Sequence, residues 1–134
     1  MNSIKIQQEA IKAARPAYIE IDNTRIALVT DGTFAVVIFK EDCLLDLVKL
    51  KKMDRNVFYT EPTAIPLNPT TELRDMGKGT ARKFIAENND VMWLSEKNIK
   101  RFGNGLTYRA KEELAFVYKN EVLLGCILPV RVKD

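Results

Sequence analysis

The feature that most constrains the fold is an Asp-Gly pair between two apolar, β-branched segments near the start of the chain. Residues 25–30 read RIALVT, residues 33–39 read TFAVVIF, and Asp31-Gly32 lies between them. Tight hairpin turns need positive φ, which Gly adopts at little cost and which Asp tolerates. The sequence therefore predicts an antiparallel hairpin here.

A helix and a further strand precede this hairpin. Residues 3–15 predict a helix that Ser3 caps and Pro16 ends, and AYIEI at 17–21 predicts a strand. At 100° per residue, one side of the helix gathers Ile4, Gln7, Ile11 and Ala14, and the neighbouring stripe gathers Lys5, Gln8, Lys12 and Arg15. We therefore expect a one-sided helix with a basic shoulder.

The last third of the chain predicts a strand, a short helix and a second meander. VMWL at 91–94 is followed by Ser95, a good N-cap, and Gly103 ends the helix. Strands are expected at 106–110, 113–118 and 121–132, with a hairpin turn at Lys119-Asn120 and a bulge or an edge at Pro129.

The middle segment, 41–92, has no dominant pattern. DCLLDLVKLKK is compatible with a helix or a buried strand, VFYT with a short strand and ARKFIAEN with a short helix. Residues 61–70 carry three prolines, which indicates an extended loop or a boundary. We expect the segment to be an insertion or an excursion across the surface.

Together these elements predict one α+β domain over residues 1–134, with antiparallel sheet meanders and both short helices packed on one face. A chain of 134 residues can bury a sizeable core. The sequence offers seven candidate core positions: Val29, Phe34, Val36, Ile99, Phe102, Phe116 and Leu124.

The residue inventory argues against most catalytic chemistry. The chain has no histidine, so it lacks the commonest general base and the commonest metal ligand. Cys43 and Cys126 lie in apolar stretches, which indicates buried thiols, and the acidic pairs Glu41-Asp42 and Glu112-Glu113 fall at expected turns. We expect no enzyme activity, no cofactor and no metal. No apolar stretch resembles a membrane span or a secretory signal, so a cytoplasmic location is expected.

Two further features have a structural and a functional interpretation. In MGKGTARK, at 76–83, a phosphate-binding loop would need a glycine where Glu72 stands, so a flexible basic loop is the better interpretation. Trp93 ends an apolar run, which favours a core position over a platform for stacking bases.

The basic residues of the two predicted helices form the candidate binding site. If both helices cover one sheet, their outward faces would present one cationic surface suited to a phosphate backbone. The candidate DNA-binding residues are Lys5, Lys12, Arg15, Lys97, Lys100 and Arg101. The alternative is two ordinary solvated helix faces, which Glu9 and Glu96 interrupt.

The order of elements resembles one domain of the bacterial DNA polymerase sliding clamp. RIALVTDGTFAVVI at 25–38 resembles the clamp segment in which a strand reaches a Thr-Asp-Gly turn and doubles back. GCILPVRV at 125–132 resembles the end of the last clamp domain, and WLSEKNIKRF at 93–102 occupies the place of the second helix.

The resemblance implies a non-catalytic module that contacts duplex DNA without reading its sequence, with the six basic residues facing the DNA. It implies a role in DNA replication, with replication proteins or further copies of the chain as partners, since one domain could build a six-domain ring only as a hexamer. The competing hypothesis is a protein-interaction or structural domain, of phage or mobile-element type, without a nucleic-acid role.

Overall fold

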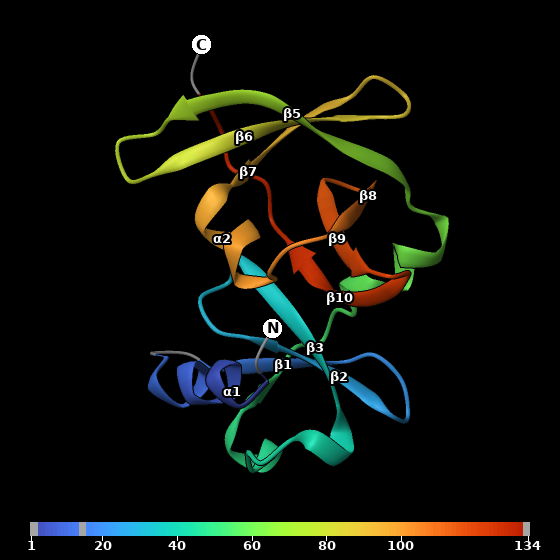
Figure 1. The fold of residues 1–134 in the computed structure, drawn as a ribbon. Helices are drawn as coiled ribbons and strands as arrows, with labels where there is room; N and C mark the ends of the chain where they lie inside the picture. Colours follow the sequence, from blue (N-terminus) through green and yellow to red (C-terminus); the bar gives the residue numbers. More distant parts are fainter. Residues whose placement is uncertain (1–2, 14–15, 133–134) are drawn as a thin grey trace.

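A ten-stranded sheet organises the chain in the computed structural model, which describes residues 3–13 and 16–132 (Figure 1). The strand order is β4-β1-β2-β3-β10-β9-β8-β5-β6-β7. β4 pairs with β1 in parallel, and the other neighbouring strands are antiparallel. The predicted α+β class is confirmed.

The strands are short except for β5 and β6. Their bounds are β1 Ala17–Glu20, β2 Arg25–Val29, β3 Phe34–Phe39, β4 Lys51–Lys52, β5 Ile65–Asp75, β6 Thr80–Ala86, β7 Val91–Ser95, β8 Thr107–Lys111, β9 Leu114–Lys119 and β10 Val122–Ile127. The helices are α1 (Ser3–Lys12) and α2 (Glu96–Arg101), with 3-10 helices η1 (Lys40–Asp42), η2 (Leu47–Lys49) and η3 (Val57–Thr63).

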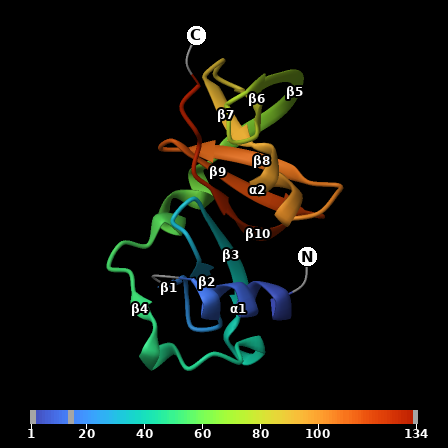
Figure 2. The ribbon, with the colours of Figure 1, turned by 90° about the vertical axis from the view of Figure 1, so that its left-hand side faces the viewer.

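Two helix–meander units make up most of the domain. In the first unit α1 precedes β1, β2 and β3; in the second α2 precedes β8, β9 and β10. The third strands of the two units pair with each other, through Val36–Gly125, Ala35–Cys126 and Phe34–Ile127. The units therefore join at the middle of the sheet, and β5, β6 and β7 extend it beyond the second unit (Figure 2).

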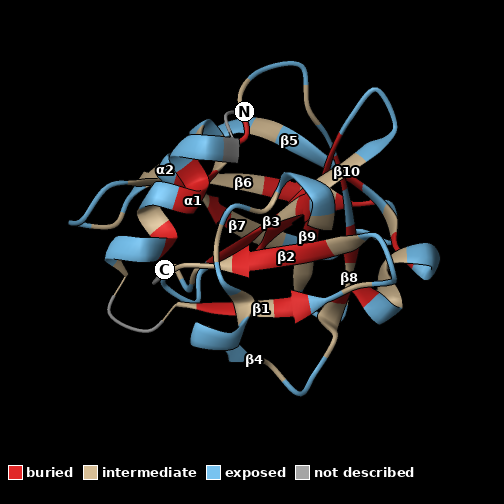
Figure 3. Cartoon of the chain, turned by 90° about the horizontal axis from the view of Figure 1, so that it is seen from below, coloured by how far each residue is buried: buried red, intermediate tan, exposed pale blue. Residues whose placement is uncertain are grey.

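The sheet curls around its main core. Ile26 in β2 and Leu94 in β7 lie far apart in the strand order, yet both are fully buried in one cluster. Ile6 of α1 and Phe102 at the end of α2 belong to the same cluster, so both helices pack into this core. Figure 3 shows the buried strands β1 and β2 at one end of the sheet, beside α1.

A smaller core covers the opposite side of the sheet. Phe116 and Cys126 point there, and η3 covers them with Phe58, whose ring lies 5.8 Å from the ring of Phe116. Successive strand residues face opposite sides of a sheet, so neighbours such as Ala115 and Phe116 enter different cores.

The predicted hairpins form, with different turns. The β2–β3 connection spans residues 30–33, with Gly32 at φ 83° and the Asp31 carboxylate accepting from the Thr33 backbone N–H at 2.9 Å. The β9–β10 turn falls at Asn120-Glu121, one residue after the predicted position, with φ 50° and 66°.

The middle of the chain contradicts several predictions. Residues 80–86 form strand β6 where a short helix was predicted, and 57–63 form η3 where VFYT predicted a strand. The proline-rich segment forms the long strand β5 from Ile65 onward. The strand tolerates Pro69 because this residue lies next to a break in register with β6. Residues 42–52 form neither a long helix nor a buried strand. Residues 65–95 supply three strands of the sheet, β5, β6 and β7.

α1 buries a different face from the one that the apolar pattern marks. Ile6 and Ala10 are buried, whereas Ile4 and Ile11 are 55% and 66% exposed. Gln7 is buried at the edge of this face, where its side chain donates to Asp42 O and accepts from Leu44 N. The neighbouring segment satisfies the Gln7 amide, which orients the helix in a way that periodicity cannot reveal.

Strand 121–132, expected at an edge, is interior, since β10 lies between β3 and β9. It ends at Ile127, and its bulge falls between Leu123 and Gly125 rather than at Pro129. After β10 the chain crosses toward β7, where Val130 N donates to Trp93 O at 2.9 Å. β1 is not an edge strand either, since it lies between β4 and β2.

The core predictions are mostly confirmed. Phe34, Val36, Phe102 and Phe116 are buried, and Val29, Ile99 and Leu124 are partly buried against the two clusters. Trp93 is only partly buried, and the Arg74 guanidinium lies 5.0 Å from its ring. Ser95 is the N-cap residue of α2, although within the described chain its side chain makes no capping hydrogen bond.

Candidate nucleic-acid interface

An ion pair fastens α1 to α2. Arg101 Nη1 donates to Glu9 Oε2 at 2.8 Å, and both side chains are largely shielded from solvent. Behind this pair, Ile6 of α1 and Ile99 of α2 pack on the main core. This ion pair therefore joins the middle of α1 to the end of α2, although 83 residues lie between the two helices.

A shallow hollow of about 540 Å³ lies between the helices and carries most of the predicted basic residues. We call it the cationic hollow; its lining is Lys5, Ile6, Glu9, Lys97, Lys100, Arg101 and Gly103. The three lysines are exposed, so their ammonium groups can reach a ligand. Four of the six predicted residues thus meet at one place.

Arg101 differs from the lysines because its guanidinium is engaged inside the protein. Besides its bond to Glu9, its Cζ lies 4.5 Å from the centre of the Phe34 ring. Its Nε is buried and, among the described residues, has no hydrogen-bond partner. These contacts make Arg101 the residue that positions α2 against α1 and β3.

The β2–β3 connection places an acidic group next to this hollow. Burial raises the pKa of Asp31, but hydrogen bonds from Thr33 and the charges of Arg101 and Lys97 outweigh this effect, so the pKa lies below its ordinary value. Thr33 Oγ1 also lies 3.3 Å from Nδ2 of the buried Asn98 in α2. Asp31 therefore remains an anion that offsets part of the cationic charge.

Two predicted residues lie outside the hollow. Lys12 is exposed at the last turn of α1, seven residues and about 10 Å along the helix axis from Lys5. Arg15 lies outside the described residues. In the sequence Glu9 is only an interruption of the basic stripe and Asp31 only a turn residue, because no local pattern indicates that either meets α2.

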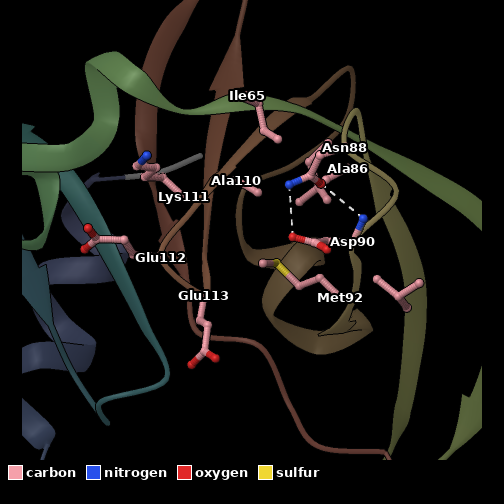
Figure 4. Close-up of a pocket in the computed structure, with 11 residues that line it drawn as sticks. Ile65, Ala86, Asn88, Asp90, Met92, Ala110, Lys111, Glu112 and Glu113 are labelled. Atoms are coloured by element: carbon pink, nitrogen blue, oxygen red, sulfur yellow. Dashed lines mark hydrogen bonds between the residues drawn. The ribbon is translucent and has the colours of Figure 1, made fainter.

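A second hollow, of about 550 Å³, has the opposite charge (Figure 4). Its floor includes Leu67, Ala86 and Met92, and its rim carries carboxylates from two hairpin turns. We call it the acidic hollow; the rim residues are Asn88, Asp90, Lys111, Glu112 and Glu113. Asn88 Nδ2 donates to Asp90 Oδ2 at 3.0 Å, and Glu112 lies 3.7 Å from the Arg55 guanidinium.

The described residues contain no cluster of three or more acidic, cysteine or histidine side chains arranged to hold a metal ion. Cys43 and Cys126 are both free thiols, and Cys126 is buried in the smaller core. Within the described ranges, no helix is long and apolar enough to cross a membrane.

Comparison with known proteins gives no match to a family model, a curated protein or a solved structure.

Proposed function

We propose that the chain is a non-catalytic, DNA-associated module that contacts the backbone of duplex DNA through α1 and α2. The observation that carries this proposal is the convergence of Lys5, Lys97 and Lys100 on one hollow from helices far apart in sequence. If the two helix faces were only ordinary solvated surfaces, nothing would favour the placement of their lysines at one hollow.

The charge of the surface suits phosphate. Glu9 and Arg101 neutralise each other, and Asp31, which lies near Lys97 and Arg101, offsets part of the charge of the three lysines of the cationic hollow. Lys12 extends the cationic surface along α1. The lysine ammonium group donates hydrogen bonds from a flexible side chain. Contacts with phosphates carry no information about the bases, so they give affinity without sequence preference.

The arrangement of the two helix–meander units supports the clamp-like form of this proposal. α1 packs on β2 of its own unit and α2 packs on β6 and β7, and both helices contribute to the same core. This order of elements supports the proposed likeness to a sliding-clamp domain. Because the comparisons give no match, the proposal rests on the geometry of the helices.

A salt titration tests the proposal. Binding to two duplexes of equal length and unrelated sequence is expected to be equal and to weaken steeply with salt. Replacing Lys97 and Lys100 with alanine should lower the slope of log affinity against log salt by about 1.8, since each phosphate contact contributes about 0.9. Fluorescence anisotropy with labelled duplexes gives this slope.

The matched control is Lys119→Ala, which removes an exposed lysine at the end of β9, outside the cationic hollow, and should leave the slope unchanged. A wild-type protein that binds neither duplex at about 50 mM salt and high micromolar concentration would rule the proposal out.

A protein-interaction domain is the second candidate, and the acidic hollow favours it. An apolar floor under carboxylates suits a partner segment that carries both basic and apolar side chains. In that case Asp90→Asn and Glu113→Gln would weaken capture of such a segment, whereas the alanine variants of Lys97 and Lys100 would not.

A further inference from the structure

Four large apolar side chains are exposed on α1 and on residues 41–48, the segment that follows β3. Ile4 and Ile11 are 55% and 66% exposed, and Leu44 and Val48 are 77% and 92% exposed. Single exposed apolar residues are ordinary, but a group on adjoining elements is typical of an interaction surface.

The two elements are fixed to each other. The Gln7 amide bonds to Asp42 O at 3.0 Å and to Leu44 N at 2.6 Å. Ile4 and Ile11 lie one helical turn on either side of Gln7, so they flank the place where the segment meets α1. Figure 3 views this end of the molecule from below, with α1 beside the chain that runs to β4.

Along this segment, alternate side chains point toward the main core and toward solvent. Cys43, Leu45 and Leu47 pack against the main core, which leaves Leu44 and Val48 facing away from it. Leu44 and Val48 are exposed because their neighbours in the chain are held against the core. We call Ile4, Ile11, Leu44 and Val48 the apolar patch.

The two elements that carry the apolar patch differ in charge. On α1 the exposed Lys5 and Lys12 form a stripe beside the two isoleucines. On residues 41–49 the exposed charged residues are the acids Glu41, Asp42 and Asp46 and the base Lys49, so this segment is acidic on balance. A twofold rotation would set the basic side of one copy against the acidic side of another, twice in the same interface.

We propose that the apolar patch is the interface through which two copies of this chain associate. α1 of each copy would pack on residues 41–48 of its partner, with the isoleucines against Leu44 and Val48 and the lysines against the acids. The charge pattern favours this occupant over an anionic lipid surface, which would repel the acids, with Asp46 lying between Leu44 and Val48 in the sequence.

Sedimentation equilibrium without nucleic acid measures the association. The wild type is expected to form a dimer of twice the 15.3 kDa chain mass at concentrations up to about 100 μM. Val48→Glu should raise the dimer Kd about tenfold or more, because it would bury a carboxylate without a partner. Tyr59→Glu is the control, since Tyr59 is 84% exposed on η3, which covers the opposite side of the sheet.

A charge exchange tests the twofold arrangement. One variant carries Lys5→Glu and Lys12→Glu, and the other carries Asp42→Lys and Asp46→Lys. Each variant alone should be monomeric because both of its contacts become repulsive. An equimolar mixture should form a heterodimer because both contacts become attractive again.

Three results would overturn the proposal: a monomeric wild type at the highest concentration, an unchanged Kd for Val48→Glu, or a mixture that stays monomeric. A monomer that sediments with anionic lipid vesicles would assign the patch to a membrane surface instead. None of these measurements uses DNA, so failure here leaves the proposed nucleic-acid function untouched. A dimer would cover Lys5 and Lys12 and leave Lys97 and Lys100 as the lysines of the cationic hollow that contact DNA.

Discussion

The two helix–meander units share one order of elements but are built from different local chemistry. α1 has ten residues and buries Ile6 and Ala10, whereas α2 has six and is held by Asn98 and by Phe102 just beyond its end. The first hairpin turns through a four-residue connection with Gly32, and the second through two non-glycine residues at positive φ.

The two units have the same order of elements although their helices and turns differ. We therefore infer that the fold depends most on the residues where the units meet. Outside the junction the units differ, since α1 packs on β2 of its own unit, whereas α2 packs on β6 and β7. At the junction, β3 and β10 pair across the middle of the sheet, and Phe102 packs directly behind them. Substitutions there should therefore affect the whole domain, and substitutions elsewhere should affect one unit.

The largest effect is expected at Gly125. A Cβ on this residue would lie 2.1 Å from Ala35 O and 2.7 Å from Phe102 Cε1, and the backbone oxygen cannot move without breaking the β3–β10 pairing. Gly125→Val should cost more than about 4 kcal/mol or prevent folding, measured by urea denaturation.

The control for this substitution is Gly77→Ala in the β5–β6 turn, where φ is 82° and nothing lies within 4 Å of an added Cβ. It should cost only about 1 kcal/mol, the penalty of the left-handed conformation alone. Equal losses at the two glycines would contradict a special role for the junction.

The ion pair between the helices should have the next largest effect. Glu9→Gln leaves the half-buried Arg101 guanidinium uncompensated and should lower the free energy of unfolding by about 1 to 2 kcal/mol. Glu20→Gln removes the exposed Lys52–Glu20 pair, at 3.6 Å, and should change it by less than about 0.5 kcal/mol. Thermal denaturation of both variants makes the comparison.

Alkaline pH should weaken the domain through the junction strand β10. Burial raises the pKa of Cys126 from its ordinary value of 9.0 to about 12. The unfolded thiol therefore ionises first, and stability falls as pH rises from about 9 toward 12, by up to about 1.4 kcal/mol per pH unit. Below about pH 9 the effect is absent.

Denaturation at pH 8 and pH 10 of the wild type, Cys126→Ala and Cys43→Ala measures this contribution. Cys126→Ala should reduce the loss between the two pH values, whereas Cys43→Ala leaves the Cys126 thiol in place and should retain it. The same loss in all three proteins would refute a contribution from Cys126.

The smallest effect is expected at the β9–β10 turn. Glu121 has φ 66° without the freedom of glycine, so Glu121→Gly should stabilise the protein by about 0.5 to 1 kcal/mol. Urea denaturation measures this gain in the free energy of unfolding. The second hairpin would then have a glycine at positive φ, as the first hairpin does. A loss of stability would show that the Glu121 side chain contributes more than its backbone conformation costs.

Local sequence signals determined the elements of both units. The Asp31-Gly32 connection, the apolar runs on either side, the helix that begins after Ser95 and ends before Gly103, and four of the seven core residues all follow from residues adjacent in the chain. These signals suffice because turn conformation and alternation of side chains depend on near neighbours.

Only the tertiary structure decided which face of α1 is buried, the strand conformation of residues 80–86 and the place of the prolines in β5. Each depends on a partner distant in the sequence: the segment at Asp42 and Leu44 for Gln7, β5 and β7 for β6, and a break in register for Pro69. The cationic hollow has the same origin. The sequence by itself determined two basic helices, but their contact depends on a folded core and on the Glu9–Arg101 pair, which joins residues 92 positions apart.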